Sequence, residues 1–304
     1  MKLLPTLKDY IWGGTKLQTL YGRDNGGKKI SESWEVSVHP DGESKFTDGT
    51  TLSEYVKNNP TCVDKKGSDL PVLIKYIDAK QNLSVQVHPS DEYAQREEGD
   101  NGKTEMWYIV SADEGAGIYC GFNRDVTKEE FEEKIKSGTV EELLNFIPVK
   151  QGDCFLIKAG TVHAICAGCL ICEVQQNSNV TYRVYDYNRV GADGKMRPLH
   201  LKKALDVINF SKFCDETNSG EEIKYDGYGI KKLTTCEYFS CHKLNVYEKF
   251  ESKNDESFTA YCVLHGKGEI NGQSFVSGDS FFIKRGEKVM ISGNAEIIVT
   301  EKGV

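Results

Sequence analysis

The segment Gly152–Ile165 reads GDCFLIKAGTVHAI, and the segment Gly278–Ile291 repeats it as GDSFFIKRGEKVMI. Both copies share the pattern G-D-x-F-x-I-K-x-G, and the runs upstream of them, EMWYIVSADEGAGI and AYCVLHGKGEINGQ, also resemble each other. Short apolar runs separated by Gly turns are typical of β-strands. Two copies of a small β unit at a long period predict two β-barrels or sandwiches joined in one chain.

The two copies differ where chemistry is expected. The first copy has His163 at the position where the second has Val289. The second copy also has no counterpart of the strand-like run LSVQVHP at Leu83–Pro89. We therefore expect the first unit to hold the functional site, and the second unit to be structural or to shape a cleft.

The run LSVQVHP alternates apolar and polar residues, so Ser84, Gln86 and His88 share one face of the predicted strand. Pro89 cannot donate to a strand ladder and ends the strand. A polar segment follows, and Lys103 and Glu105 then lie two residues apart, on one face of the next apolar run.

Four of these polar side chains form a candidate metal site. Gln86, His88, Glu105 and His163 together offer nitrogen and oxygen ligands without a thiolate. Such a set suits zinc with an open position, or another first-row divalent ion. The alternative is that the polar face is only the solvent face of a half-buried sheet.

Composition and charge exclude several classes of protein. The chain has 304 residues, a formal charge of −8 and a pI near 5.4, which argue against a nucleic-acid surface. No run approaches the length of a membrane span, and the N-terminus does not read as a signal peptide. We therefore expect a cytoplasmic protein whose ten cysteines are reduced thiols. Cys166, Cys169 and Cys172 are interpreted as small buried residues rather than metal ligands.

The longer pattern G-D-x-x-x-I-x-x-G-x-x-H in the first copy resembles the second motif of the cupin superfamily of small jelly-roll barrels. A wider set of motifs, occurring in the right order, resembles the type I mannose-6-phosphate isomerases, and most of all the short bacterial form of that family. These motifs are WGG at Trp12–Gly14, SESWEVS at Ser31–Ser37, LSVQVHP at Leu83–Pro89, GKTEMWY at Gly102–Tyr108, and GTVHAI through EVQQNSNVTYRVYD at Gly160–Asp186.

The resemblance implies a fold and domain organisation. We expect a mainly β protein with two cupin-type jelly-roll units, a small helical insertion and a connecting helix. Residues 1–198 would form the catalytic cupin domain, with the helical insertion at about 126–146, where Thr127 and Glu130 form a capping box. Residues 199–235 would form a helical connector, and residues 236–304 a degenerate C-terminal cupin domain.

The resemblance also implies a metal and its ligands. The Q-x-H strand of the family matches Gln86 and His88, its K-x-E matches Lys103 and Glu105, and its later histidine matches His163. These residues, without Lys103, would hold one zinc ion per chain. Lys103 would then lie beside the metal, and we favour it for proton transfer.

Further site residues follow from the same resemblance. Arg183 matches an active-site arginine of the family, and Glu173, ten residues earlier, is the rival base. Ser84 and Arg189 are expected to contact the phosphate. Asn179 stands where family members commonly carry Asp, and it is assigned to substrate binding.

Simpler roles exist for the charged residues of this set. Lys103 and Arg189 could be exposed surface charges, since lysine and arginine are mostly found there. Arg183 could form a structural ion pair with Asp186, which follows it closely in the chain.

The favoured function is a zinc-dependent isomerase that interconverts D-mannose 6-phosphate and D-fructose 6-phosphate through an enediol. The alternatives are a non-catalytic sugar-binding protein with two cupin units and a cupin oxygenase using iron or copper. The pair Gln86 and His88 argues against the oxygenase, because such sites favour histidine-rich ligand sets. The expected partner is a small sugar phosphate, without nucleic acid or membrane, and the chain would be a monomer or a homodimer.

Overall fold

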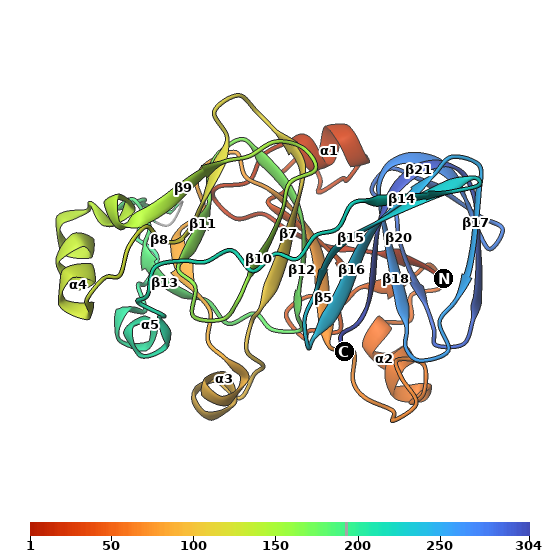
Figure 1. Cartoon of the computed structure of the whole chain (residues 1–304), viewed down its shortest axis with the longest axis horizontal. Helices are drawn as coiled ribbons and strands as arrows, with labels where there is room; N and C mark the ends of the chain where they lie inside the picture. Colours follow the sequence, from red (N-terminus) through yellow and green to blue (C-terminus); the bar gives the residue numbers. More distant parts are fainter. Residues whose placement is uncertain (192–193) are drawn as a thin grey trace.

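The computed structural model describes residues 1–191 and 194–304, and it contains three antiparallel β-sheets. Two of these sheets form the N-terminal unit, shown on the left of Figure 1. The six-stranded sheet has the order β10 (Cys154–Ile157), β7 (Glu105–Ala112), β12 (Cys169–Gln176), β5 (Val72–Asp78), β3 (Glu32–Val36) and β2 (Thr6–Lys8). The five-stranded sheet has the order β13 (Tyr182–Tyr185), β6 (Val85–Val87), β11 (His163–Ile165), β8 (Gly117–Phe122) and β9 (Leu144–Pro148).

The C-terminal unit is a ten-stranded sheet on the right of Figure 1. Its main path is β14 (Glu222–Tyr225), β15 (Tyr228–Thr235), β16 (Phe239–Val246), β21 (Lys288–Lys302), β18 (Thr259–Ile270), β20 (Ser280–Ile283), β1 (Lys2–Leu4) and β4 (Lys45–Phe46). Beside this path, β17 (Lys249–Lys253) pairs with β21, and β19 (Gln273–Val276) pairs with β18. Val289, which aligns with His163, is buried in the apolar core of this unit.

The six-stranded sheet lies in the middle of the molecule and is buried on both faces. Strand β5 shows why, because all seven residues of VLIKYID are buried. Tyr76 packs in the core shared with the C-terminal unit, where its hydroxyl donates to the carbonyl oxygen of Val263 (3.1 Å). Ile77, one residue on, packs with Trp107 and Ile165 between the two N-terminal sheets. Because successive side chains of β5 point to opposite faces of the sheet, this strand contributes residues to both cores.

Short helices surround this framework: α1 (Lys16–Tyr21), α2 (Leu52–Asn58), α3 (Asp91–Glu97), α4 (Lys128–Ser137), the 3₁₀ helix η1 (Val140–Leu143) and α5 (Leu201–Val207). Helix α4 begins as predicted, since the Thr127 side chain accepts a hydrogen bond from the backbone N–H of Glu130 (3.2 Å). Phe131 of α4 and Ala204 of α5 pack in one core with Val87 and so cover the outer face of the five-stranded sheet (Figure 1).

The prediction of a mainly β fold with a second, repeated unit is confirmed, and α4 with η1 forms the expected helical insertion. Sheet membership differs from the expected boundaries in two places. Strands β14 and β15 lie within 199–235 and already belong to the C-terminal sheet, so the connecting helix is limited to α5. Strand β1, at the other end of the chain, pairs with β20 of that same sheet. Both differences arise from pairing between distant strands.

Candidate metal centre and active site

Strand β6 carries the polar face that the sequence predicted. Val85 and Val87 are fully buried against the helices on the outer face, whereas Ser84 and Gln86 line a pocket on the inner face. Leu83 precedes the strand and lines the same pocket, so it does not pack with the two valines. The register of the sheet places Gln86 opposite His163 of β11 and Arg183 of β13.

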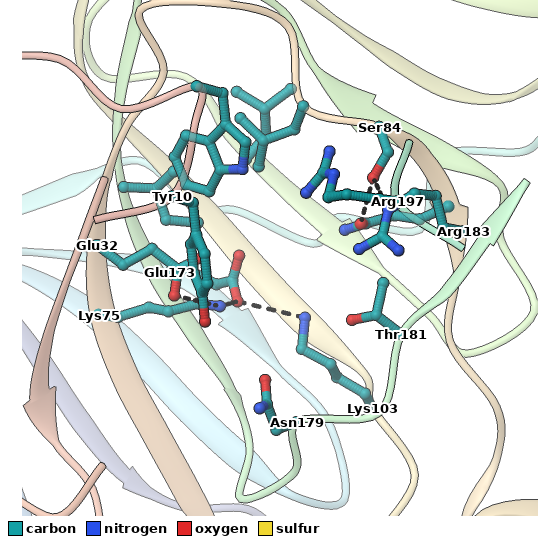
Figure 2. A pocket seen from close by; sticks show the side chains of 15 residues that line it. Tyr10, Glu32, Lys75, Ser84, Lys103, Glu173, Asn179, Thr181, Arg183 and Arg197 are labelled. Carbon is teal, nitrogen blue, oxygen red and sulfur yellow. Dashed lines mark hydrogen bonds and ion pairs between the residues drawn. The ribbon is translucent and has the colours of Figure 1, made fainter. Parts of the chain in front are cut away.

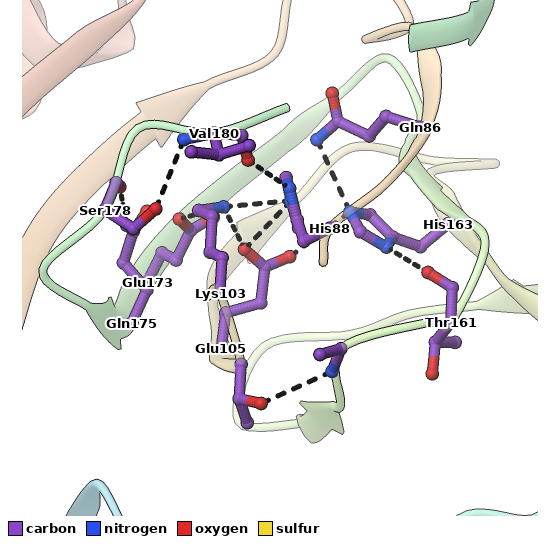
Figure 3. A network of polar contacts seen from close by, with 12 residues as sticks. Gln86, His88, Lys103, Glu105, Thr161, His163, Glu173, Gln175, Ser178 and Val180 are labelled. Carbon is purple, nitrogen blue, oxygen red and sulfur yellow. Dashed lines mark hydrogen bonds and ion pairs between the residues drawn. The ribbon is translucent and has the colours of Figure 1, made fainter. Parts of the chain in front are cut away.

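Three fully buried side chains converge next to Gln86, as Figure 3 shows. Potential ligand atoms of His88, Glu105 and His163 all lie within 4.8 Å of one another. The carboxylate of Glu105 lies between the rings, with Oε2 3.5 Å from His88 Nε2 and Oε1 3.3 Å from His163 Nε2. The Gln86 amide is 3.4 Å from His163 Nε2 and completes the predicted set of four.

Backbone carbonyl groups orient both histidines. His88 Nδ1 contacts the carbonyl oxygen of Val180 (2.8 Å), and His163 Nδ1 contacts that of Thr161 (2.9 Å). A carbonyl only accepts, so each Nδ1 carries the proton and each Nε2 presents a lone pair towards Glu105. Burial, together with Lys103, lowers the pKa of His163 to about 3 and the pKa of His88 well below its usual value. Both rings are therefore neutral, as metal ligation requires.

The donor set fits a cation. Glu105 Oε1 is buried and has no hydrogen-bond partner among the described residues, which is costly for a carboxylate unless a ligand satisfies it. The ammonium of Lys103 contacts His88 Nε2 (3.0 Å) and Glu105 Oε2, so these atoms already attract one positive charge. Two imidazole nitrogens, one carboxylate and one amide match the ligand types of a zinc ion with an open position.

A row of buried charges lies beside the donor set. Strand register aligns Trp107, Glu173, Lys75 and Trp34 across four neighbouring strands. Glu173 Oε1 is 3.1 Å from Lys75 Nζ and 3.4 Å from Lys103 Nζ, while Trp107 Nε1 donates to Glu173 Oε2 (2.9 Å). Burial alone would raise the pKa of Glu173, but Lys103 and Lys75 outweigh it and lower the pKa. Glu173 is therefore a buried, ionised carboxylate.

These charges form one end of a pocket with a volume of about 270 Å³. Figure 2 shows Lys103 and Glu173 on one side and Ser84, Arg183 and Arg197 on the other. Arg183 Nε donates to Ser84 Oγ (3.2 Å). The full lining comprises Tyr10, Trp12, Glu32, Lys75, Ile77, Leu83, Ser84, Gln86, Lys103, Ile165, Glu173, Asn179, Thr181, Arg183 and Arg197.

The structure brings most of the predicted site residues together in this pocket. Lys103 is buried, so it is not a surface charge, and Asp186 pairs with Arg189 and Arg197 rather than with Arg183. Asn179 lines the pocket, and its amide donates to Asp41 Oδ2 (2.7 Å).

Four predicted residues are not among the described lining residues: Arg189, and the buried His88, Glu105 and His163, of which His163 contacts Gln86 and His88 contacts Lys103. Sequence reasoning missed Arg197, Glu32 and Lys75. Lys75 did carry a signal, because a lone charge within the apolar run PVLIKYID requires a buried partner.

The three clustered cysteines behave as predicted. Cys166, Cys169 and Cys172 are buried, and Cys172 packs in the apolar core between the units. Within residues 1–191 and 194–304, the one group of histidine, cysteine and acidic side chains close enough to hold a metal is that of His88, Glu105 and His163. No helix in the described part of the chain has both the length and the apolar character needed to cross a bilayer.

Two packed β-sheets that carry a buried His–Glu–His group, joined to a second β unit with the same repeated sequence pattern, define a two-unit cupin protein with one candidate metal site. Family models match two parts of the chain: the phosphomannose isomerase type I catalytic domain at residues 1–132, and the mannose-6-phosphate isomerase cupin domain at residues 229–302. The chain belongs to the type I phosphomannose isomerase family, as the sequence motifs predicted.

Known relatives support this assignment along the whole chain. The mannose-6-phosphate isomerase ManA of Bacillus subtilis is 39% identical over 97% of this chain and 96% of its own length. The Streptococcus mutans mannose-6-phosphate isomerase is 35% identical over 92% of this chain and 88% of its own.

Solved structures agree with the fold. A crystal structure of the mannose 6-phosphate isomerase from Bacillus subtilis superposes with a TM-score of 0.92 at 34% identity, covering 99% of this chain and 98% of that one. A mannose 6-phosphate isomerase crystallised with zinc and yttrium shares the fold, with a TM-score of 0.76 at 17% identity over 100% of this chain and 99% of that one.

Proposed function

We propose that this chain interconverts D-mannose 6-phosphate and D-fructose 6-phosphate, using one zinc ion held by Gln86, His88, Glu105 and His163. The relatives suggest the substrate, because several of them are named for the same isomerisation. One observation of the chain itself carries the proposal. A single pocket, which Gln86 of the donor set lines, joins the buried Lys103–Glu173 pair to an arginine-rich wall. The hydroxyl groups of a sugar phosphate would lie at the end of the pocket with Lys103 and Glu173. Its anionic phosphate would lie at the arginine-rich wall.

The proposed zinc ion would act as a Lewis acid that polarises a sugar oxygen or orients a water molecule. Around it, the chain supplies a desolvated environment. Burial of Glu105, His88 and His163 removes water from the reacting end of the pocket. Electrostatic interactions are stronger there than in water, which favours charge development on a sugar oxygen.

Proton transfer between C1 and C2 is assigned to the Lys103–Glu173 pair. An enediol mechanism needs one group to remove a proton from one carbon and return it to the neighbouring carbon. Glu173 is ionised and lines the pocket, so it can accept that proton. Lys103 lies 3.4 Å from Glu173 Oε1, and its ammonium can donate to the oxygen on which the enediolate charge develops. Sequence reasoning favoured Lys103 for proton transfer, with Glu173 as the rival base, and the present proposal divides the task between the two residues.

The opposite wall of the pocket is assigned to the phosphate. Arg183 offers a planar fork of donors, and Ser84 lies 3.2 Å from its Nε. Asn179 and Thr181 also line this pocket, where the sugar hydroxyl groups would lie. A cytoplasmic location and a monomeric or homodimeric state stay predictions from the sequence and the family.

The deciding experiment is turnover of mannose 6-phosphate by the purified chain. Formation of fructose 6-phosphate should be lost after exhaustive chelation and should return when one equivalent of zinc is added. Mannose without phosphate is the matched control substrate, and it should turn over much less efficiently. Absence of turnover by the fully zinc-loaded protein would refute the proposed reaction. Full activity in a metal-free sample would refute the role given to zinc.

A further inference from the structure

Arg189 and Arg197 both stand near the phosphate end of the pocket, and both contact Asp186, but they are bonded differently. Arg189 uses all three of its guanidinium nitrogens within the protein: Nε donates to the Asp186 carbonyl oxygen, Nη1 to the Asn82 carbonyl oxygen and Nη2 to Asp186 Oδ1. Its guanidinium carbon also lies 5.3 Å from the centre of the Tyr187 ring. All three guanidinium nitrogens of Arg189 are therefore used in contacts within the protein.

Among the described residues, Arg197 is hydrogen-bonded on one side only. Its Nε donates to Asp186 Oδ2 (2.8 Å) and its Nη2 to Asp186 Oδ1 (2.6 Å), a two-point contact that fixes the plane of the guanidinium. Its Nη1 has no hydrogen-bond partner among the described residues, and the side chain lines the pocket. Figure 2 shows its head group beside that of Arg183 and next to Ser84.

The charges at this end of the pocket are unbalanced. Arg189 and Arg197 share the single carboxylate of Asp186, and Arg183, which contacts Ser84, adds a third guanidinium, so these four groups carry a formal charge of +2. Burial, followed by the nearby charge of Arg197, lowers the pKa of Arg183. Two adjacent cations in a half-buried wall are stabilised by an anion between them, and a phosphate monoester carries about −1.5 to −2 charges at pH 7.

The backbone that precedes Arg189 is also unusual. Tyr187 and Asn188 are consecutive non-glycine residues in the left-handed region, with φ of 55° and 52°. Non-glycine residues rarely adopt this conformation, so the surrounding structure must impose this turn. The turn returns the chain towards Asp186, and the carbonyl oxygen of Pro198, which follows Arg197, accepts from Arg183 Nη1 (3.0 Å). Arg183 is thus held by the residue that follows Arg197, and Asp186 fixes Arg197.

We propose that Arg197, oriented by Asp186, binds the phosphate group together with Arg183 and Ser84, and that it sets the preference for a phosphorylated sugar. Arg189 instead stabilises the turn and does not touch the substrate. This inference rests on the proposed isomerase function, and it reassigns the phosphate contact that the sequence alone gave to Arg189. A salt bridge that leaves one guanidinium nitrogen unbonded is pre-organised to bind an anion.

The test compares Arg197→Gln with Arg189→Gln in zinc-loaded protein. We expect Arg197→Gln to raise KM for mannose 6-phosphate, and to weaken competitive inhibition by inorganic phosphate, by roughly tenfold to a hundredfold, as for the loss of a charged hydrogen bond. The KM for unphosphorylated mannose should be unchanged. Arg189→Gln should lower the melting temperature but change phosphate inhibition less than threefold. Arg197→Lys keeps the charge without the fork and should lie between Arg197→Gln and the unmodified chain.

Either of two results would overturn the inference: phosphate inhibition unaffected by Arg197→Gln, or weakened equally by both glutamine variants. Calorimetric titration with inorganic phosphate provides the same comparison without turnover. It separates a failure of this inference from a failure of the proposed reaction, since phosphate binding can be measured even if mannose 6-phosphate is not the substrate. Far-ultraviolet circular dichroism of each variant identifies any that fails to fold, and Arg197→Lys then carries the comparison.

Discussion

Replacing Glu173 by Gln tests the acid–base assignment directly. Gln keeps the size of the side chain and can still accept the hydrogen bond from Trp107 Nε1, but it removes the charge that faces Lys75 at 3.1 Å and Lys103 at 3.4 Å. If Glu173 is the proton acceptor, kcat should fall by about 10² to 10⁴, the usual contribution of a positioned general base. That fall corresponds to roughly 3–5 kcal/mol in the activation free energy.

The same substitution should leave the metal in place. Glu173 does not belong to the group of His88, Glu105 and His163, so zinc content should stay near one per chain. The matched variant is Glu105→Gln, which alters the carboxylate between the two histidines and should lose zinc as well as activity. Metal analysis of both variants therefore separates loss of the base from loss of the ion.

The assay is conversion of mannose 6-phosphate in deuterated water, followed by proton magnetic resonance at C1 and C2. Glu173→Gln should slow deuterium incorporation as much as it slows turnover, because both need the proton acceptor. Breaking a buried ion pair can also destabilise the fold by about 3–5 kcal/mol, so rates are compared below the melting transition. A kcat within tenfold of the unmodified chain, with zinc bound, would show that Glu173 is not the base and would return that role to Lys103.

Two predictions concern stability. Asp64 pairs with Lys302, which lowers the pKa of Asp64 despite its burial. The charge of Asp64 therefore stabilises the fold above its unfolded pKa of about 3.9, and that stabilisation is lost as the pH falls below this value. Urea melts of Asp64→Asn should show a deficit of about 2 kcal/mol at pH 7 that shrinks by pH 3, while the exposed Asp255→Asn changes little; an equal deficit at both pH values would contradict the linkage. Phe282→Ala removes a ring whose centroid lies 5.8 Å from that of Phe258, and it should lower the free energy of unfolding in thermal melts by about 3–5 kcal/mol. A decrease below about 1 kcal/mol would show that the core shared by the two units contributes little to stability.

Local patterns indicated the candidate metal site because its residues are close in sequence or belong to a repeat. Period-two alternation placed Gln86 and His88 on one face, and the same rule holds for Lys103 and Glu105. The repeat then identified His163, because its counterpart in the second copy is an apolar core residue. In each case the prediction needed only the geometry of one strand.

Residues that depend on pairing between distant strands were not predicted. Lys75 meets Glu173 only because β5 lies beside β12 in a particular register. Glu32 joins them from a third strand, and Arg197 reaches the pocket from the irregular segment before α5. A charge within an apolar run predicts that a buried partner exists, but it does not identify the partner residue. The same limit explains why β14 and β15 were assigned to a connector.

Strand β1 shows what this long-range pairing means for a chain leaving the ribosome. Lys2 and Leu3 pair with Phe281 and Ser280, so this pairing cannot form until residues up to β20 have been synthesised. At about 5–20 residues per second, that delay is roughly 15–55 s. During this delay β20 has not been synthesised. The backbone N–H and C=O groups of β1 that will pair with β20 therefore stay accessible to other strands or to a chaperone. Non-local pairing of this kind is slow to form, so completion of the C-terminal sheet is expected to be the last step of folding.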